Sequence, residues 1–211
     1  MKILYIGVLR NGLNPNRQQG DKKSDTVVLC GAKDLEKTFN WAQRSRVEPL
    51  MMFNVHGIAE TTKPGQRQNL EHQKFVFHAY SRTQGLASVI VTDDEYPSLV
   101  AHQLLSKIMD EFLTKYPRAA TDPSPTENSC PFPSPLEEWI KKYDNPENAD
   151  SIMKIQQELD STKIVLHKTI ESVLARGETL DQLLKRSEDL SASSKGFYQQ
   201  SRAQNSCCIV M

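Results

Sequence analysis

From residue 152 onward, large apolar residues recur at alternating steps of three and four, and charged or polar residues fill nearly all the positions between them. The apolar members of this series are Ile152, Ile155, Leu159, Leu166, Val173, Leu180, Leu183, Leu190 and Phe197. Two positions in seven make a stripe that is typical of a coiled-coil seam and too narrow for the core-facing side of a globular helix. Alone, such a helix buries almost nothing, so we expect it to be largely unfolded until partner helices cover the seam.

One position of this seam is charged. Arg176 lies between Val173 and Leu180, where a buried guanidinium without partners is strongly unfavourable. A partner that offers several carbonyl oxygens at this level satisfies its donors and fixes the register. In a parallel homodimer, two arginines would face each other. Arg176 therefore favours a hetero-oligomeric bundle, although periodicity alone leaves a lipid-anchored homodimeric coiled-coil tether as the alternative.

The chain ends in a prenylation motif, Cys208-Ile209-Val210-Met211, in which the final methionine favours a farnesyl group on Cys208. One lipid chain gives only reversible membrane binding, and the adjacent Cys207 offers a second chain by S-palmitoylation. A zinc or disulfide fragment is the other interpretation, but no second cysteine or histidine pair has suitable spacing. No apolar run approaches the ~18 residues that span a bilayer. Lipid is therefore the expected anchor.

Composition bounds the remaining possibilities. The chain has 211 residues, no net formal charge and 38% hydrophobic residues, which suits one modest core and no nucleic-acid partner. Cys30 and Cys130 are too few for a disulfide scaffold and suit a reducing compartment. Leu13 and Asn14 stand where a phosphate-binding loop needs Lys-Ser/Thr, which argues against a prenylated small GTPase. The histidines show no metal-ligand spacing, and nothing indicates a small-molecule substrate.

A proline-rich stretch over 117–135 divides the chain and predicts a linker. Before it, patterns of period two and period 3.6 alternate. They predict strands over 3–9, 26–30, 75–80 and 86–92, and a polar, edge-like strand over 66–71. They also predict one helix that begins near Ser45 and a second that begins at Pro97 and ends before Pro117. This order predicts a compact α/β module with a five-stranded, mostly antiparallel sheet and flanking helices.

Several segments resemble a known family. The run from Ile155 to Glu171, the block Val173-Leu174-Ala175-Arg176-Gly177-Glu178 and the ending Asn205-Ser206-Cys207-Cys208-Ile209-Val210-Met211 are similar to the lipid-anchored longin R-SNAREs of fungi and animals, in the synaptobrevin superfamily. Tyr5-Ile6-Gly7-Val8, Gly65-Gln66-Arg67-Gln68 and Thr92-Asp93-Asp94-Glu95-Tyr96-Pro97 resemble their longin domain. The resemblance covers nearly the whole chain. One departure is Trp41-Ala42, where the family has an aromatic pair.

The resemblance implies a profilin-like longin domain over 1–118, a linker with a short helix over 119–148, an R-SNARE motif over 149–207 and the prenylation box at 208–211. It also implies that Arg176 is the central-layer residue, that Cys208 is farnesylated and that Cys207 is palmitoylated. The seam would pair with syntaxin-like and light-chain-like Q-SNARE helices, three in all, in a parallel four-helix bundle. That bundle would drive ER–Golgi, intra-Golgi and vacuolar or lysosomal vesicle fusion.

Further implications concern partners and location. A disassembly ATPase with its adaptor would recycle the bundle, and the chain would be neither an enzyme nor a cofactor protein, apart from its covalent lipids. It would lie on the cytoplasmic side of Golgi, ER-derived vesicle, endosomal and vacuolar membranes, with a cytosolic pool. In that pool, the longin domain would fold over the SNARE motif and shelter the farnesyl chain.

Overall fold

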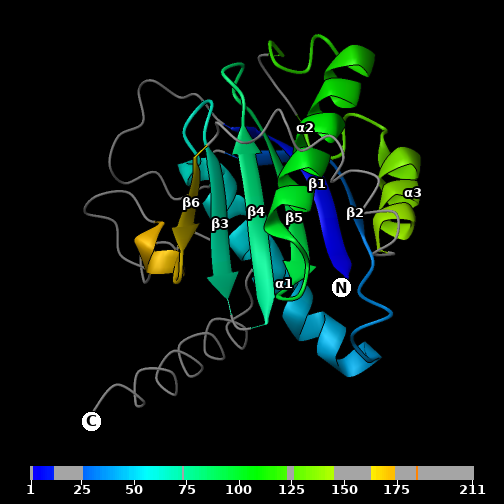
Figure 1. The fold of residues 1–211 in the computed structure, drawn as a ribbon. Helices are drawn as coiled ribbons and strands as arrows, with labels where there is room; N and C mark the ends of the chain where they lie inside the picture. The colour runs from blue at the N-terminus through cyan, green and yellow to red at the C-terminus, as the bar shows by residue number, and fades with distance from the viewer. Residues whose placement is uncertain are drawn as a thin grey trace.

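The structure is a computed structural model, and it describes residues 2–11, 26–72, 74–122, 126–144, 163–173 and Leu184. The elements occur in the order β1, β2, α1, β3, β4, β5, α2, α3, β6 and η2 (Figure 1). The strands are β1 Ile3–Asn11, β2 Thr26–Lys33, β3 Arg67–His72, β4 Phe75–Ser81, β5 Leu86–Asp93 and β6 Ile164–His167. The helices are α1 Trp41–Thr61, α2 Ser98–Lys115, α3 Pro133–Tyr143 and the short 3₁₀ helix η2 Ile170–Ser172.

All six strands form one sheet in the order β2-β1-β5-β4-β3-β6. The first five strands pair antiparallel with their neighbours, which confirms the sheet predicted from the sequence. The sixth strand comes from the segment predicted as coiled coil, and it pairs parallel with β3. The sheet is therefore mixed, and β3 is an internal strand. Within the five antiparallel strands, β3 is at the edge, as its polar pattern indicated, and β6 covers that edge.

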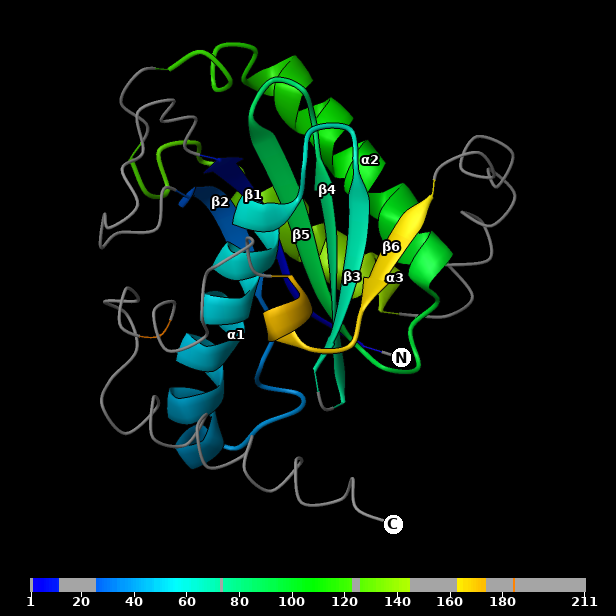
Figure 2. The same cartoon turned by 90° about the vertical axis from the view of Figure 1, so that its left-hand side faces the viewer.

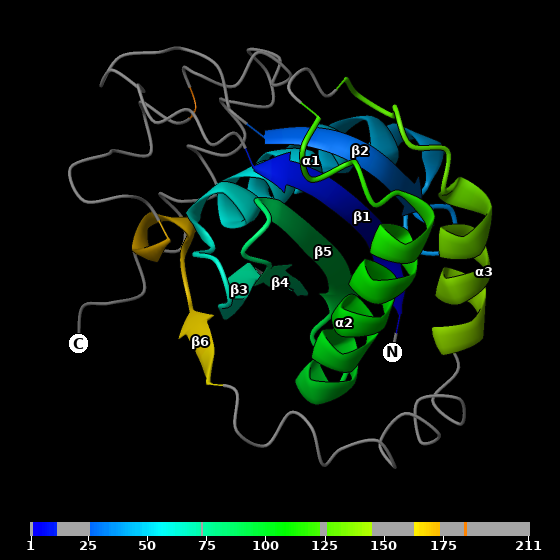
Figure 3. The same cartoon turned by 90° about the horizontal axis from the view of Figure 1, so that it is seen from above.

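Helices cover both faces of the sheet. Figure 3 shows α1 on one face and α2 with α3 on the other. Each interface has its own apolar cluster. The cluster under α2 and α3 includes the fully buried Val100, Leu104 and Phe112, and the cluster under α1 includes Val55 and Ile58. Because helices cover both faces of the sheet, a further strand can be added only at an edge, and β6 is added at the outer side of β3.

Helix α1 begins earlier than the predicted start near Ser45. Asn40 caps it: the side chain of Asn40 accepts from the backbone N–H of Gln43 at 3.0 Å, and the Gln43 side chain accepts from the backbone N–H of Asn40 at 3.1 Å. This reciprocal capping box satisfies two donors that the helix start leaves free. No residue over 41–50 of α1 is buried, and Trp41 is 83% exposed. The apolar stripe therefore begins later than the helix does.

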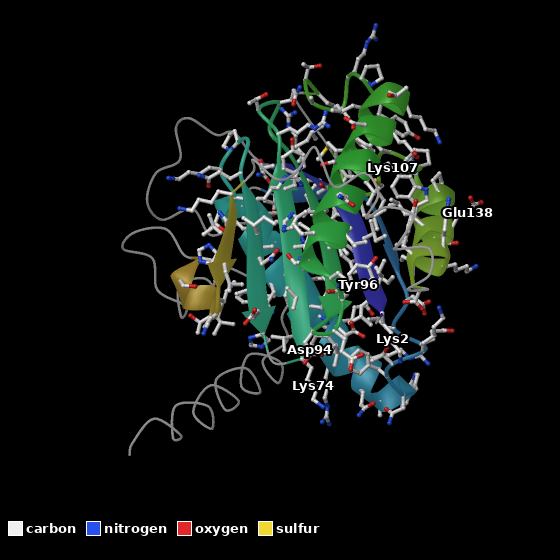
Figure 4. All side chains as sticks on the ribbon, in the orientation of Figure 1. Lys2, Lys74, Asp94, Tyr96, Lys107 and Glu138 are labelled. Carbon is white, nitrogen blue, oxygen red and sulfur yellow. The ribbon has the colours of Figure 1, made fainter. Side chains whose placement is uncertain are left out.

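Helix α3 lies within the stretch predicted as a linker, and it packs into the core. Leu136 and Ile140 of α3 are buried against the cluster under α2. Lys107 of α2 reaches across to α3, where its Nζ lies 5.3 Å from the ring centroid of Trp139 (Figure 4). The prolines do not oppose this helix, because Pro133 occupies its first turn, where no intrahelical N–H bond is needed. Helix α3 is therefore part of the packed domain.

The end of α3 is tied to the start of the chain. Asp144 Oδ1 accepts from the backbone N–H of Ile3 at 2.9 Å, and Asp144 Oδ2 pairs with Lys37 Nζ at 3.2 Å. Tyr96 donates its hydroxyl hydrogen to the carbonyl of Tyr143 at 3.2 Å.

Among the described residues, no helix combines the length and apolar character needed to cross a membrane, and no cluster of His, Cys, Asp and Glu suits a metal ion.

Candidate protein-interaction site

The site is the outer side of β3 together with the face of α1 beside it, where residues 163–173 are docked. Strand β3 carries polar side chains, and buried contacts of these side chains hold the strand in place. Arg67 is 5% exposed, and its guanidinium donates to the carbonyl of His102 at 2.9 Å and to Ser106 Oγ at 2.6 Å. The same guanidinium lies 4.0 Å from the ring centroid of Tyr80, in a cation–π contact. These contacts hold β3 firmly against α2.

A second buried network joins β3 to β4 and α2 through Asn69. His78 Nδ1 and His102 Nε2 donate to Asn69 Oδ1 at 2.9 and 2.7 Å, and Asn69 Nδ2 donates to Ser98 Oγ at 2.7 Å. Burial lowers the pKa of His78 to about 3. Burial, with the nearby His78 and Arg67, lowers the pKa of His102 to about 2. Both imidazoles are therefore neutral. The network holds β3 in position against β4 and α2.

Strand β6 adds to the free side of β3. Its register pairs Arg67 with Ile164, Gln68 with Val165, Asn69 with Leu166 and Leu70 with His167. Figure 2 shows β6 running along the outer side of β3. Because registered neighbours share a face of the sheet, Leu166 lies on the α2 side beside Asn69. It is beyond the cover of α2 and is 53% exposed.

The chain then turns into η2. Thr169 O accepts from the backbone N–H and from Oγ of Ser172 at 3.1 and 2.6 Å, and Ile170 O accepts from the backbone N–H of Val173 at 3.0 Å. His167 Nδ1 lies 3.2 Å from Ser172 Oγ. Burial lowers the pKa of His167, against a smaller opposing effect of the hydrogen bond to Ser172. The tight turn takes the chain from the sheet edge to α1.

Three apolar side chains fill the space under α1. Ile170 is 1% exposed, Val173 is 6% exposed and Leu184 is 2% exposed. All three belong to the cluster that also contains Met51, Val55 and Ile58 of α1 and Leu70 and Phe77 of the sheet. Burial of this size stabilises the docked segment by about 1.5–3 kcal/mol for each large side chain, before the entropy of ordering is subtracted.

The predicted site residues fall into two groups. Leu166 and Val173 are described, and the structure separates them: Leu166 is exposed on β6, while Val173 is buried under α1. The other predicted site residues lie outside the described residues: Ile152, Ile155, Leu159, Leu180, Leu183, Leu190, Phe197, Arg176, Cys207 and Cys208.

The conformation of residues 163–173 differs from the predicted seam helix. They form a strand and a 3₁₀ turn because the amino-terminal domain supplies a β-strand edge and an apolar face, which a lone amphipathic helix lacks. Ile170 and Leu184 were missed as site residues. The available signal was that they are large apolar residues outside the seam, on a segment whose other non-seam positions are mostly polar.

Comparison with known proteins agrees with this geometry. A family model described as "Regulated-SNARE-like domain", Longin, matches residues 36–136, and the Synaptobrevin model matches residues 151–208. The docked segment thus lies within the synaptobrevin match, and its docking surface is built from the amino-terminal domain.

Relatives match over the full length. The chain is 48% identical to the synaptobrevin homolog YKT6 of Yarrowia lipolytica over 211 residues, which is 100% of both chains. It is 46% identical to the synaptobrevin homolog YKT6 of Saccharomyces cerevisiae, again over 100% of both. It is 43% identical to the VAMP-like protein YKT61 of Arabidopsis thaliana over 89% of this chain and 92% of that one. The chain therefore belongs to the longin-domain R-SNAREs of the synaptobrevin superfamily, proteins of vesicle trafficking that are not enzymes and carry no cofactor.

Proposed function

We propose that this chain is the R-SNARE of a parallel four-helix bundle, in which three Q-SNARE helices cover its seam and drive intracellular vesicle fusion. The seam spacing and the synaptobrevin match over 151–208 support this proposal. Arg176 is the central-layer residue, facing one glutamine from each partner helix. Burial of the seam supplies the free energy that draws two membranes together.

A closed form precedes assembly. Its supporting observation is the docking of residues 163–173 as β6 and η2, with Val173 buried under α1. A strand and a 3₁₀ turn are incompatible with a continuous seam helix through the same residues. Docking and bundle assembly therefore compete for one segment, and the longin domain acts as an intramolecular inhibitor.

Lipids on Cys207 and Cys208 hold the chain at the membrane in the assembled state. The farnesyl group is attached to Cys208, and reversible palmitoylation of Cys207 supplies the second chain that stable anchoring needs. In the closed form, the longin domain shelters the farnesyl chain and maintains a cytosolic pool. The membranes served are the Golgi, ER-derived vesicles, endosomes and the vacuole, and a disassembly ATPase with its adaptor returns the chain to that pool.

The test compares the full chain with the fragment 149–207, each mixed with three Q-SNARE helices. The fragment should form a heat-stable complex with all three helices, and the full chain should form the same complex more slowly. Equal assembly rates would remove the inhibitory role of the longin domain. A fragment that pairs only with itself in sedimentation experiments would instead support the homodimeric tether.

A further inference from the structure

We infer that Ile170 and Leu184 form a docking contact that serves the closed form alone, separate from the seam that serves the bundle. The inference rests on the proposed function and adds to it the residues that set the balance between the two forms. Its starting point is the different burial of residues that lie close together on one segment.

Burial in the closed form does not follow the seam. Leu166 occupies a seam position and is 53% exposed, while Ile170 lies outside the seam and is 1% exposed. Leu184, also outside the seam, is 2% exposed. Val173 is the one described seam residue that docking buries, at 6% exposure. Among the described residues, the set of side chains that the longin domain buries therefore shares only Val173 with the seam.

Sequence register gives these two residues a common position. Ile170 follows the seam residue Thr169, and Leu184 follows the seam residue Leu183. Both seam residues are the second of the two seam positions in their heptads, so Ile170 and Leu184 occupy the e position, which flanks the seam. The other residues at this heptad position along 149–207 are Gln156, Lys163, Gly177, Ser191, Tyr198 and Asn205. Ile170 and Leu184 are the two large aliphatic residues at this position, and the structure buries both.

The surface that Ile170 and Leu184 contact is apolar. Both belong to an apolar cluster built from α1 and from the sheet, and Figure 2 shows η2 beside α1. The cluster includes Ala59 and Leu70, which are fully buried. A polar side chain at position 170 would lose this burial, and it would leave every seam position unchanged. The closed form can therefore be weakened through Ile170 or Leu184 with little effect on the strength of the bundle.

The test uses the full chain with Ile170→Ser, and Leu166→Ser and Val173→Ser as matched controls. Hydrogen exchange of the β3 amides and of residues 164–173 measures docking without any partner. Amides of β1 and β5 report whether the domain remains folded. Ile170→Ser should speed exchange at the docked segment by roughly 10- to 100-fold, the loss expected when one large apolar side chain is no longer buried. Leu166→Ser should leave this exchange unchanged.

Assembly with Q-SNARE helices supplies the second readout. Ile170→Ser should assemble faster than the unmodified chain and give a bundle of unchanged thermal stability. Leu166→Ser should lower bundle stability, and Val173→Ser should weaken both docking and the bundle. Leu184→Ser should repeat the result of Ile170→Ser.

Unchanged exchange in both Ile170→Ser and Leu184→Ser would overturn the inference. So would a bundle of Ile170→Ser that melts as low as that of Leu166→Ser. Failure of every chain, including the unmodified one, to form a bundle would refute the proposed function instead. The exchange result, which needs no partner, would still decide whether Ile170 holds the docked segment.

Discussion

The amino-terminal folding unit should extend to residue 144, so that a fragment ending at 118 fails to fold. The segment beyond 118 contributes Phe132, Leu136, Ile140 and Tyr143 to the core, each at most 4% exposed. At about 1.5–3 kcal/mol for each buried side chain, their loss removes about 6–12 kcal/mol. The whole stability of a domain of this size is about 5–15 kcal/mol. Removal of the segment also uncovers the apolar surface of α2 around Phe112.

Urea unfolding of the fragments 1–118 and 1–144, followed by circular dichroism, checks this expectation. The fragment 1–144 should unfold in one cooperative transition, and 1–118 should show none or should aggregate. Within 1–144, Leu136→Ala should lower the free energy of unfolding by about 2–5 kcal/mol, while the exposed neighbour Glu137→Ala should change it little. Cooperative unfolding of 1–118 with a stability close to that of 1–144 would refute the reasoning.

Three further predictions follow from buried groups and from the tail. Because burial lowers the pKa values of His78 and His102, the unfolded chain binds more protons than the folded chain below pH 6.5. The free energy of unfolding should therefore fall by up to about 1.4 kcal/mol per pH unit for each histidine as the pH drops from 6.5 toward 3. Urea titrations at pH 7, 6 and 5 measure this loss. Gly7→Ala should lower the melting temperature, since its new methyl group would overlap the buried ring of Tyr5, at a cost of about 1–3 kcal/mol; a calorimetric scan with no shift would contradict this packing. Cys208→Ser should move the chain from the membrane to the soluble fraction on centrifugation, and an unchanged distribution would argue against the prenyl anchor.

Much of the amino-terminal fold could be predicted from the sequence. The strand at residues 3–9 reads as buried on both faces, and Ile3, Ile6 and Leu9 are indeed at most 1% exposed. The stripe of α2 also predicts its buried face, since helical periodicity survives in any helix that covers a sheet. These elements depend on local patterns, which a single sequence contains.

Two features could not be predicted in this way, because they depend on distant contacts. The polar side chains of β3 gave no sign of the partners that bury Arg67 and Asn69 under α2. Residues 164–167 were predicted as part of a helix, because the heptad spacing is the stronger pattern in this segment and it corresponds to the proposed bundle. The structure shows these residues as a strand. Ile170 was overlooked because it lies outside the heptad seam.

The account depends most on one segment that changes conformation between the closed and the assembled form. Backbone chemical shifts of residues 164–173, measured by NMR in the free full chain and again after assembly with Q-SNARE helices, test this directly. We expect extended-strand shifts at 164–167 in the free chain and helical shifts throughout the segment in the assembled bundle. Helical shifts in the free chain, or strand shifts that persist in the bundle, would contradict the account.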